Sequence, residues 1–299
     1  MSIDVPFATS GTTGDPVTWF RTQDQLAAET HLLAELVGTV EQVVSFAPPH
    51  HLYGRLFGVE LPRLLGVDVV PAWDDPLTLP TLATDVLIVC VPSTWSLLRR
   101  HLPTLAERRV VATHSTARTT LSCYDVAAAL PGLAGIELLG STETGAVATR
   151  RIDPVERHQT EWTLLPDVDQ VADPDRLHVR GPRIGRRHDM ARPPGSWLMP
   201  DLITPTGPRT FRHLGRAGRL VKVNGKRCDL SAIESLVRVT AQVEVECVPV
   251  VDQIRGEHYD LYYTSETLTP ADIRTRLAEV RGDNPAPRLV HRMELLPSR

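Results

Sequence analysis

The chain has 299 residues, 42% of them hydrophobic, and a formal net charge of −4 at pH 7. A chain of this length can bury a hydrophobic core and has room for two domains. The slightly acidic balance disfavours binding to nucleic acids or anionic membranes, because both need clustered basic charge. We therefore expect no nucleic acid and no membrane among its partners.

The sequence also bears on cellular targeting and on the state of the cysteines. The N-terminal residues MSIDVPFATS have no basic start and no apolar core, so they do not resemble a signal peptide. No stretch approaches the roughly 20 uncharged apolar residues that cross a bilayer. The four cysteines are far apart and form no CxxC pair, which predicts buried free thiols. These patterns predict a soluble, cytoplasmic protein.

The first two-thirds of the chain alternates two kinds of pattern. Short apolar runs rich in β-branched residues predict strands buried on both faces, and amphipathic stretches between them predict helices. Thr22 is a candidate N-cap for the first helix. In chain order, we expect a helix at 25–37, a strand at 43–47, a helix at 52–65, a strand at 85–91, a helix at 95–101, and strands at 109–113 and 136–139. This alternation predicts an α/β fold built on a layered sheet.

The remaining third changes character. Prolines and short strands between about 154 and 210 indicate a small β-rich subdomain that completes an N-terminal domain of residues 1–215. After it, 220–223 and 226–228 flank Asn224-Gly225, which is a hairpin signal. A helix capped by Asp229 at 230–239, strands at 243–251 and 259–263, a helix at 270–280 and a strand at 289–293 follow. This βαββαβ-like order predicts a small α+β lid domain at 216–299.

The first chemical motif is FATSGTTGDP at Phe7–Pro16. Its glycines let backbone N–H groups approach phosphate oxygens, and its hydroxyls donate beside them. The motif is not a Walker loop, because Gly14 is followed by Asp-Pro-Val rather than by Lys and Ser or Thr. The alternative is a Gly/Ser/Thr turn that binds no ligand.

The second motif is LGSTETG at Leu139–Gly145, directly after a predicted buried strand. Ligand sites in α/β sheets lie at the carboxyl ends of strands. The Glu143 carboxylate suits a hard cation that also bridges phosphates. The alternative is a helix-capping turn of the Ser/Thr-x-x-Glu type.

Three further segments carry candidate site residues. They are PPHHLYG at Pro48–Gly54, MPDL at Met199–Leu202 and GRAGRLVKVNG at Gly215–Gly225. In chain order, FATSGTTGDP, LGSTETG and GRAGRLVKVNG together resemble the adenylate-forming superfamily of acyl-CoA synthetases, aryl-acid ligases and peptide-synthetase adenylation domains. The resemblance covers essentially the whole chain. It implies that ATP, with Mg²⁺, and a carboxylic acid are joined into an acyl-AMP.

The resemblance also implies roles for single residues around the nucleotide. The loop residues Thr9, Ser10, Gly11, Thr12, Thr13 and Gly14 would hold the pyrophosphate end of ATP, although Val17 stands where a lysine is usual. Gly140 and Ser141 would line the nucleotide site, Thr142 would contact a phosphate and Glu143 would hold Mg²⁺. Asp201 and Arg216 would approach the ribose; for Asp201 the alternative is a surface turn.

Lys222 matches the lysine that acts when a thiol attacks the acyl-AMP, and a glycine at position 218 would leave the lid free to pivot. That thiol would belong to CoA or to the pantetheine of a carrier protein. Lys226 is expected to be a solvated hairpin lysine.

His51 and Gly54 match the P-x-x-H-x-x-G segment beside the acid pocket of aryl and acyl ligases; the alternative for His51 is a purely structural histidine. Amino-acid-activating domains place an aspartate in this segment to pair with the substrate amine, and 45–49 contains no acidic residue. A buried, unpaired ammonium would be costly. We therefore expect an aryl or other acid without an α-amine.

The length suggests a short form of the superfamily, without the usual N-terminal region. The end LLPSR resembles the lead into the final lysine motif and stops before that lysine, while the chain contains only Lys222 and Lys226. The leading interpretation is an AMP-forming ligase. The alternatives are a catalytically impaired homologue that binds nucleotide or acyl-adenylate and works through a partner or complementing subunit, and an enzyme of the thiol-transfer half-reaction alone.

Overall fold

The computed structural model describes residues 4–8, 17–116, 119–156, 161–216, 219–223, 226–252, 256–282 and 284–297; at 216, 220, 222, 226–227, 251–252 and 256–257 it describes the backbone alone. The chain forms two compact units. The first contains Met1–Pro174, His178–Met199 and Pro205–Arg212, and the second contains Asp175–Leu177, Pro200–Thr204 and His213–Arg299. The division into domains at 215/216, with a β-rich subdomain at about 154–210, stays a prediction.

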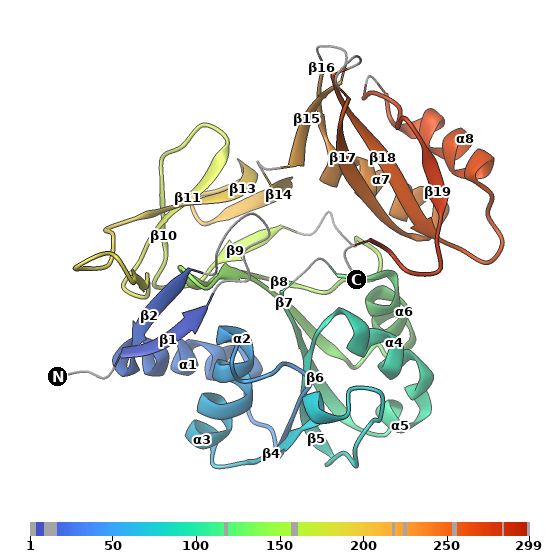
Figure 1. The fold of residues 1–299 in the computed structure, drawn as a ribbon. Coiled ribbons are helices and arrows are strands. Elements are labelled where there is room, and N and C mark those ends of the chain that lie inside the picture. The colour runs from blue at the N-terminus through green and yellow to red at the C-terminus, as the bar shows by residue number, and fades with distance from the viewer. Residues whose placement is uncertain are drawn as a thin grey trace. The chain divides into compact units, whose positions relative to one another are not determined.

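The centre of the first unit is a parallel sheet. Neighbouring strands β4, β3, β5, β6 and β7 pair in parallel, at Asp68–Pro71, Gln42–Ser45, Asp85–Cys90, Arg109–His114 and Ala134–Ser141 respectively (Figure 1). The β-branched runs that predicted strands at 43–47, 85–91 and 109–113 lie in β3, β5 and β6. The predicted α/β fold class is confirmed.

Helices cover both faces of this sheet. Side chains alternate between the two faces along each strand, so both faces carry apolar side chains that the helices bury. Val43, Leu87 and Val111 pack on one face, in a hydrophobic cluster with α1 (Gln23–Val37), α2 (Leu52–Arg55), the π-helical turn η1 (Leu56–Glu60) and α3 (Leu61–Leu65). Val44 and Ile88 pack on the other face, with α4 (Pro92–Arg100), α5 (Leu102–Ala106) and α6 (Leu121–Ala129). The two helical layers are separated by the strands in Figure 1.

The start of α1 follows directly from the sequence. The Thr22 hydroxyl accepts a hydrogen bond from Gln25 N at 3.1 Å, and the Gln25 side chain accepts one from Thr22 N at 3.0 Å. This capping box satisfies two N–H groups that a helix start otherwise leaves without partners. Thr22 is thus confirmed as the N-cap.

Antiparallel strands extend the sheet beyond β7. The eleven strands follow the order β10-β11-β13-β14-β9-β8-β7-β6-β5-β3-β4. The added strands are β8 (Gly145–Arg151), β9 (Trp162–Leu164), β10 (Asp169–Val171), β11 (Arg176–Arg180), β13 (Trp197–Pro205) and β14 (Thr210–Arg216). The sequence did not predict β13 or β14; in β13, Pro200 and Pro205 argue against a strand.

A separate three-stranded sheet, also absent from the sequence predictions, has the order β1-β2-β12. Its strands are β1 (Asp4–Ala8), β2 (Thr18–Thr22) and β12 (Arg186–Arg187). β1 and β2 pair in antiparallel register from Asp4↔Thr22 to Ala8↔Thr18. The hairpin therefore pairs Ala8 with Thr18, on either side of residues 9–17 in the sequence. A short 3-10 helix, η2 (Ala72–Asp74), follows β4.

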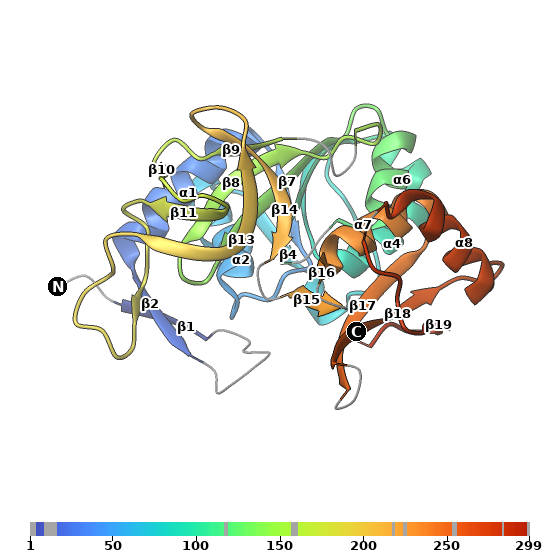
Figure 2. The same cartoon turned by 90° about the horizontal axis from the view of Figure 1, so that it is seen from above.

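From β15 on, the second unit consists of two strands, a helix, two strands, a helix and a strand, in the order that the sequence predicted (Figure 2). β15 (Leu220–Val223) and β16 (Lys226–Asp229) form the predicted hairpin, and α7 (Leu230–Ala241), β17 (Glu244–Asp252), β18 (Gly256–Thr264), α8 (Pro270–Val280) and β19 (Val290–Arg292) follow. The cross-strand pairs Val245↔Tyr263 and Cys247↔Leu261 share one sheet face. That face packs against α7 and α8 in a single hydrophobic cluster. Asp229 caps α7, as predicted, by accepting a hydrogen bond from Ser231 N at 2.8 Å.

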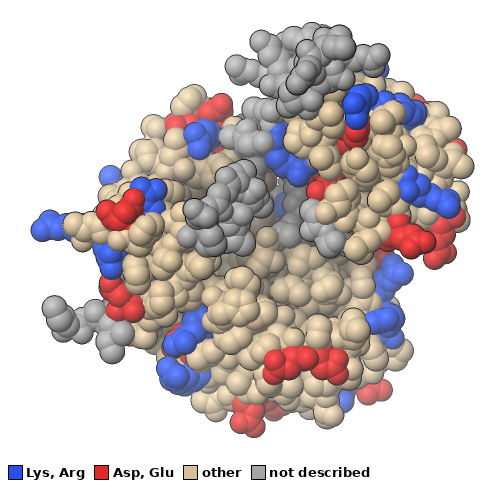
Figure 3. Space-filling view, in the orientation of Figure 1, with Lys and Arg blue, Asp and Glu red and all other residues tan. Residues whose placement is uncertain are grey.

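The surface carries mixed charge. Figure 3 shows basic and acidic side chains interspersed over one face. Ion pairs of the chain include Arg186 with Asp4, at 2.7 Å. All four cysteines are buried and free, as predicted. Among the described residues, no helix has the length and apolar character needed to span a membrane.

Candidate nucleotide site

The carboxyl ends of β3, β5, β6 and β7 meet at one edge of the parallel sheet. The P-x-x-H-x-x-G segment follows β3, and the Gly140–Gly145 motif lies at the end of β7. Two segments that are about 90 residues apart in the sequence therefore share the edge at which α/β sheets bind ligands. The structure brings these two predicted site segments together.

The second motif forms a tight hairpin. β7 and β8 pair down to Ser141↔Gly145, so Thr142, Glu143 and Thr144 make the turn. The register shifts at Leu139/Gly140, and a Cβ on Gly140 would lie 2.2 Å from the Gly145 carbonyl oxygen. Only glycine fits there. A strand rather than a helix follows the turn, which removes the helix-capping alternative.

The backbone of this turn is held, while two of its side chains are unengaged. Gly185 N donates to the Glu143 carbonyl oxygen at 2.7 Å, and the Ser141 and Thr144 hydroxyls lie 3.1 Å apart. Thr142 and Glu143 are half-buried. Within the described parts of the chain, no hydrogen bond or ion pair engages the Thr142 hydroxyl or the Glu143 carboxylate. Both groups are therefore available to a ligand.

These donors fit a phosphate-bound Mg²⁺. Among the described residues, no group of three or more His, Cys, Asp or Glu side chains is placed to bind a metal by itself. Mg²⁺ commonly takes one or two carboxylates and completes its shell with phosphate oxygens and water. A single free carboxylate on a turn, next to a free hydroxyl, matches that mode of binding.

The P-x-x-H-x-x-G segment leads into α2. His51 is the residue before the helix; it is exposed, and its ring centroid lies 4.2 Å from that of His50. Partial desolvation, followed by the charge of His50, lowers the pKa of His51. The imidazole is therefore biased towards its neutral form, which donates or accepts hydrogen bonds.

Gly54 has a packing reason to be glycine. A Cβ at this position would lie 2.1 Å from the Pro48 carbonyl oxygen and 2.6 Å from that of Ala47. The next-door side chain, Tyr53, ties the helix to the sheet: its hydroxyl lies 2.9 Å from the Thr113 hydroxyl and donates to the Cys90 carbonyl at 3.3 Å. Gly54 thus lets α2 lie directly against the turn before it.

Of the first motif, the structure describes Phe7 and Ala8; the predicted site residues Thr9, Ser10, Gly11, Thr12, Thr13 and Gly14 lie outside the described residues. The strands on either side of it are described, and the last pair is Ala8↔Thr18.

Asp201, Arg216 and Lys222 belong to the second unit. Asp201 lies in β13 with 1% of its surface exposed, and His213 Nε2 lies 2.8 Å from its Oδ1. A buried strand position excludes the surface-turn alternative. Arg216 ends β14, and Lys222 lies in β15 opposite Arg227, with only their backbones described.

Two residues at the sheet edge escaped the sequence predictions. Ser115 and Thr116 follow β6, and the Ser115 hydroxyl donates to the Leu138 carbonyl at 3.2 Å. Thr116 has φ 77°, a left-handed conformation that costs a threonine free energy and is concentrated at functional sites. The available signal was the pair of hydroxyls directly after a buried strand, the same signal that identified the Gly140–Gly145 motif.

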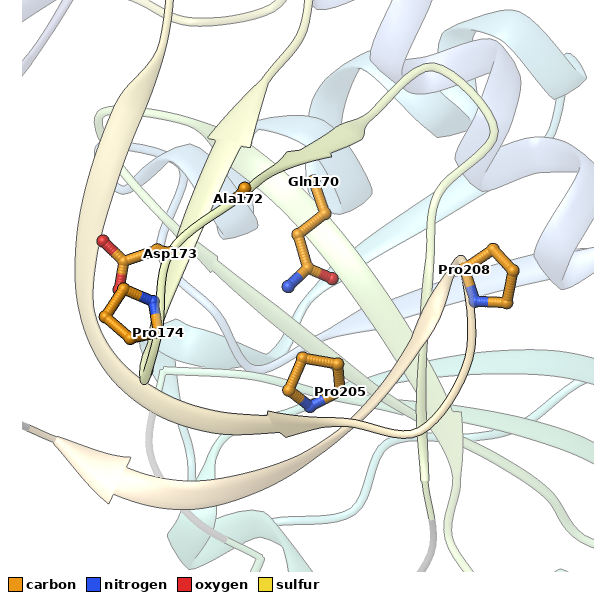
Figure 4. A pocket seen from close by; sticks show the side chains of 6 residues that line it. All are labelled: Gln170, Ala172, Asp173, Pro174, Pro205 and Pro208. Carbon is orange, nitrogen blue, oxygen red and sulfur yellow. The ribbon is translucent and has the colours of Figure 1, made fainter.

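An open hollow of about 640 Å³ lies elsewhere on the first unit, lined by Gln170, Ala172, Asp173, Pro174, Pro205 and Pro208 (Figure 4). Three of these six side chains are proline rings. The lining contains none of the predicted site residues and offers little that could bind a nucleotide. The sheet edge is therefore the better candidate site.

No protein-family model matches the chain. A curated relative, a 4-coumarate–CoA ligase from Halorhodospira halophila, is 34% identical over 198 residues, which are 60% of this chain and 49% of the relative. The chain thus spans about half the length of that relative.

Solved structures agree on the fold. ATP-bound MatB from Rhodopseudomonas palustris superposes with a TM-score of 0.79 at 20% identity, covering 98% of this chain and 64% of MatB. The o-succinylbenzoate–CoA synthetase MenE from Bacillus subtilis, in complex with ATP and magnesium, gives 0.73 at 17% identity, covering 98% and 66%. The chain thus shares its fold with these two enzymes and part of its sequence with the 4-coumarate–CoA ligase.

Proposed function

We propose that the chain activates a carboxylic acid with ATP and Mg²⁺. A carboxylate oxygen of the acid attacks the α-phosphorus in line, pyrophosphate leaves, and an acyl-AMP remains. The observation that carries the proposal is the turn at Thr142 and Glu143. It presents a hydroxyl and a carboxylate that no other described residue engages, at the carboxyl edge of the sheet, in a fold shared with ATP-bound MatB.

The acid is one without an α-amine, of the aryl or acyl class. The segment from Ser45 to Pro49 contains no carboxylate, and the Ser45 hydroxyl is already used, since it donates to the Ala47 carbonyl at 3.0 Å. An ammonium group would find no counter-charge in this segment, and leaving it unpaired would be costly. His51 and the Tyr53–Gly54 turn of α2 lie beside this end of β3 and would line the acid site.

In a second step, the sulfur of a thiol attacks the acyl carbonyl and AMP leaves, so that a thioester forms. Lys222 is proposed to serve this step. The acceptor is CoA or the pantetheine of a carrier protein, and Asp201 and Arg216 would hold the ribose of the nucleotide.

ATP–pyrophosphate exchange tests the first step. We expect exchange with one class of acid in a panel of aryl, fatty and amino acids. Glu143→Gln should lower exchange by about 10²-fold or more, since it removes a charge aimed at the phosphates and Mg²⁺. The matched control is Glu35→Gln, an exposed glutamate on α1, which should leave the rate unchanged.

The other outcomes separate the alternatives. ATP binding without exchange for any acid would contradict the proposal and favour a nucleotide-binding homologue that works through a partner. Thioester formation from supplied acyl-AMP, again without exchange, would favour the thiol-transfer half-reaction alone.

A further inference from the structure

Four charged side chains, three of them buried and one half-buried, form a cluster behind the Thr142–Glu143 turn. Arg21 (β2), Glu29 (α1) and Arg183 (between β11 and β12) are 0%, 0% and 2% exposed, and Asp167 joins them. We call Arg21, Glu29, Asp167 and Arg183 the Glu29 cluster. Burying charges in this way is costly unless each is paired, so their arrangement calls for an explanation.

The cluster is internally paired. Glu29 Oε2 lies 2.9 Å from Arg21 Nη1 and 3.2 Å from Arg183 Nη1. Arg183 also forms a bidentate pair with Asp167, at 2.5 Å and 2.8 Å. Burial lowers the pKa of Arg21 despite the nearby Glu29. For Arg183, burial also opposes the charge, but Asp167 and Glu29 outweigh it and raise the pKa.

The cluster binds the backbone of the hairpin just after the turn. Ala146 N donates to Glu29 Oε1 at 2.7 Å, and Arg183 Nη2 donates to the Ala146 carbonyl oxygen at 2.8 Å. A Cβ on Gly145 would lie 2.4 Å from Glu29 Oε2 and 2.7 Å from Arg21 Nη1, and Gly145 has φ +71°. Only glycine allows the charged groups to approach this closely.

The segment that carries Arg183 also contacts the turn itself. The Gln25 side chain donates to the carbonyl oxygens of Pro182 and Ile184, at 3.0 Å each, which fixes this segment against α1. Gly185 N then donates to the Glu143 carbonyl oxygen at 2.7 Å. The turn is therefore held on both sides: at Ala146 by the Glu29 cluster and at Glu143 by the neighbouring Gly185.

We infer that Glu29, Arg21 and Arg183 are positioning residues, which fix the Thr142–Glu143 turn relative to β2, the strand that follows the Thr9–Gly14 motif in the sequence. Charged groups suit this task, because a charge-assisted hydrogen bond is shorter and stronger than a neutral one. The part of this inference that concerns nucleotide binding rests on the proposed function. The part that concerns the position of the turn does not.

A second buried pair on the same hairpin supplies a matched control. Arg150 Nε lies 2.6 Å from Glu137 Oε2, each side chain is 7% exposed, and the pair links β8 to β7. The Arg150 guanidinium also stacks 4.6 Å from the centre of the Trp162 ring. Glu137→Gln removes a comparable buried charge pair without touching the turn.

Amide hydrogen exchange, resolved for residues 142–146, tests the positioning. Glu29→Gln should speed exchange there by about tenfold or more, the loss expected for a hydrogen bond to a charged group. Glu137→Gln should leave it unchanged. Equal exchange at 142–146 in both variants would overturn the inference. If Glu29→Gln does not fold, Glu29→Asp keeps the charge but withdraws it from Ala146 N, and the same acceleration is expected.

Titration with Mg-ATP then tests the link to function. We expect affinity to fall about tenfold in Glu29→Gln and to stay at the wild-type value in Glu137→Gln. An equal fall in both variants would overturn the positioning role in binding. If the wild type binds no ATP, the proposed function fails, while the exchange data still decide whether the cluster positions the turn.

Discussion

His213 Nε2 lies 2.8 Å from Oδ1 of Asp201, and the aspartate is 1% exposed. The two residues lie in the neighbouring strands β13 and β14, and both belong to the second unit. A carboxylate this deeply buried needs donors to hold its orientation. The imidazole of His213 is one such donor, and it fixes the aspartate that we expect to bind ribose.

We predict that His213→Leu lowers the free energy of unfolding by about 1–3 kcal/mol, the cost of removing one partner of a buried polar group. AMP affinity should fall in the same variant. Urea unfolding and calorimetric titration measure the two effects. Arg212→Ala is the control, because this neighbouring side chain is 64% exposed and should cost less than about 0.5 kcal/mol. Equal losses in the two variants would show that the His213–Asp201 contact has no special value.

Gly54→Ala should destabilise the first unit. The new Cβ would meet the carbonyl oxygens of Pro48 and Ala47, which belong to the backbone and cannot rotate away. Overpacking of this kind costs about 1–3 kcal/mol, sometimes more. Thermal unfolding measures it. Gly132→Ala is the control, since a Cβ there meets nothing within 4 Å. Equal melting temperatures for the two variants would contradict the close approach of α2 to the turn before it.

Thr142→Val should separate binding from stability. The Thr142 hydroxyl has no partner among the described residues, so the melting temperature should change little. If the hydroxyl binds a phosphate, its loss should weaken Mg-ATP binding by about ten- to a hundredfold, the range for hydrogen bonds to charged groups. Thr78→Val, at an exposed position, is the control. Unchanged ATP affinity would remove Thr142 from the site.

The buried thiols should react slowly in the native protein. Burial, followed by the charge of Asp229, raises the pKa of Cys228 to about 11. Burial also raises the pKa of Cys90, Cys123 and Cys247 well above the usual thiol range. Because only the thiolate attacks, we predict little reaction with a disulfide reagent at pH 8, and reaction of all four thiols in denaturant. Rapid reaction of a native thiol at pH 8 would contradict this.

The raised pKa of Cys228 also predicts how the free energy of unfolding changes with pH. Between its usual value of 9.0 and about 11, the Cys228 thiol keeps its proton in the folded chain and loses it in the unfolded chain. The unfolded state then binds fewer protons, so the free energy of unfolding falls as the pH rises through this window. Urea unfolding at pH 8, 9.5 and 11 should show a smaller decline for Cys228→Ala than for the wild type.

Local patterns were enough to predict much of the fold. The strands β3, β5 and β6 are buried on both faces, so each appears in the sequence as a short continuous apolar run. That run is the pattern that predicted a strand. Thr22 and Asp229 cap their helices through contacts within three residues, which a sequence displays directly. The same holds for the hairpin of β15 and β16.

Long-range pairing could not be predicted in this way. Arg21 and Arg183 are 162 residues apart, and nothing local in either segment indicates that they share Glu29. β12 has two residues and is defined as a strand by its antiparallel pairing with β2. The site followed the same rule: the Thr142–Glu143 turn was visible in the sequence, while the charges behind it became visible only in three dimensions.

The register of β1 and β2 has a consequence for how this protein could be altered. Pairing continues to Ala8 and Thr18, so the strand ladder itself holds these two positions together. Closing a loop costs little extra free energy when its length changes, and here the closure is already made. The segment between Ala8 and Thr18 could therefore be replaced while the pairing of β1 with β2 is kept. A loop from a relative, including one with a lysine near position 17, could be grafted in without disturbing the strands that carry it.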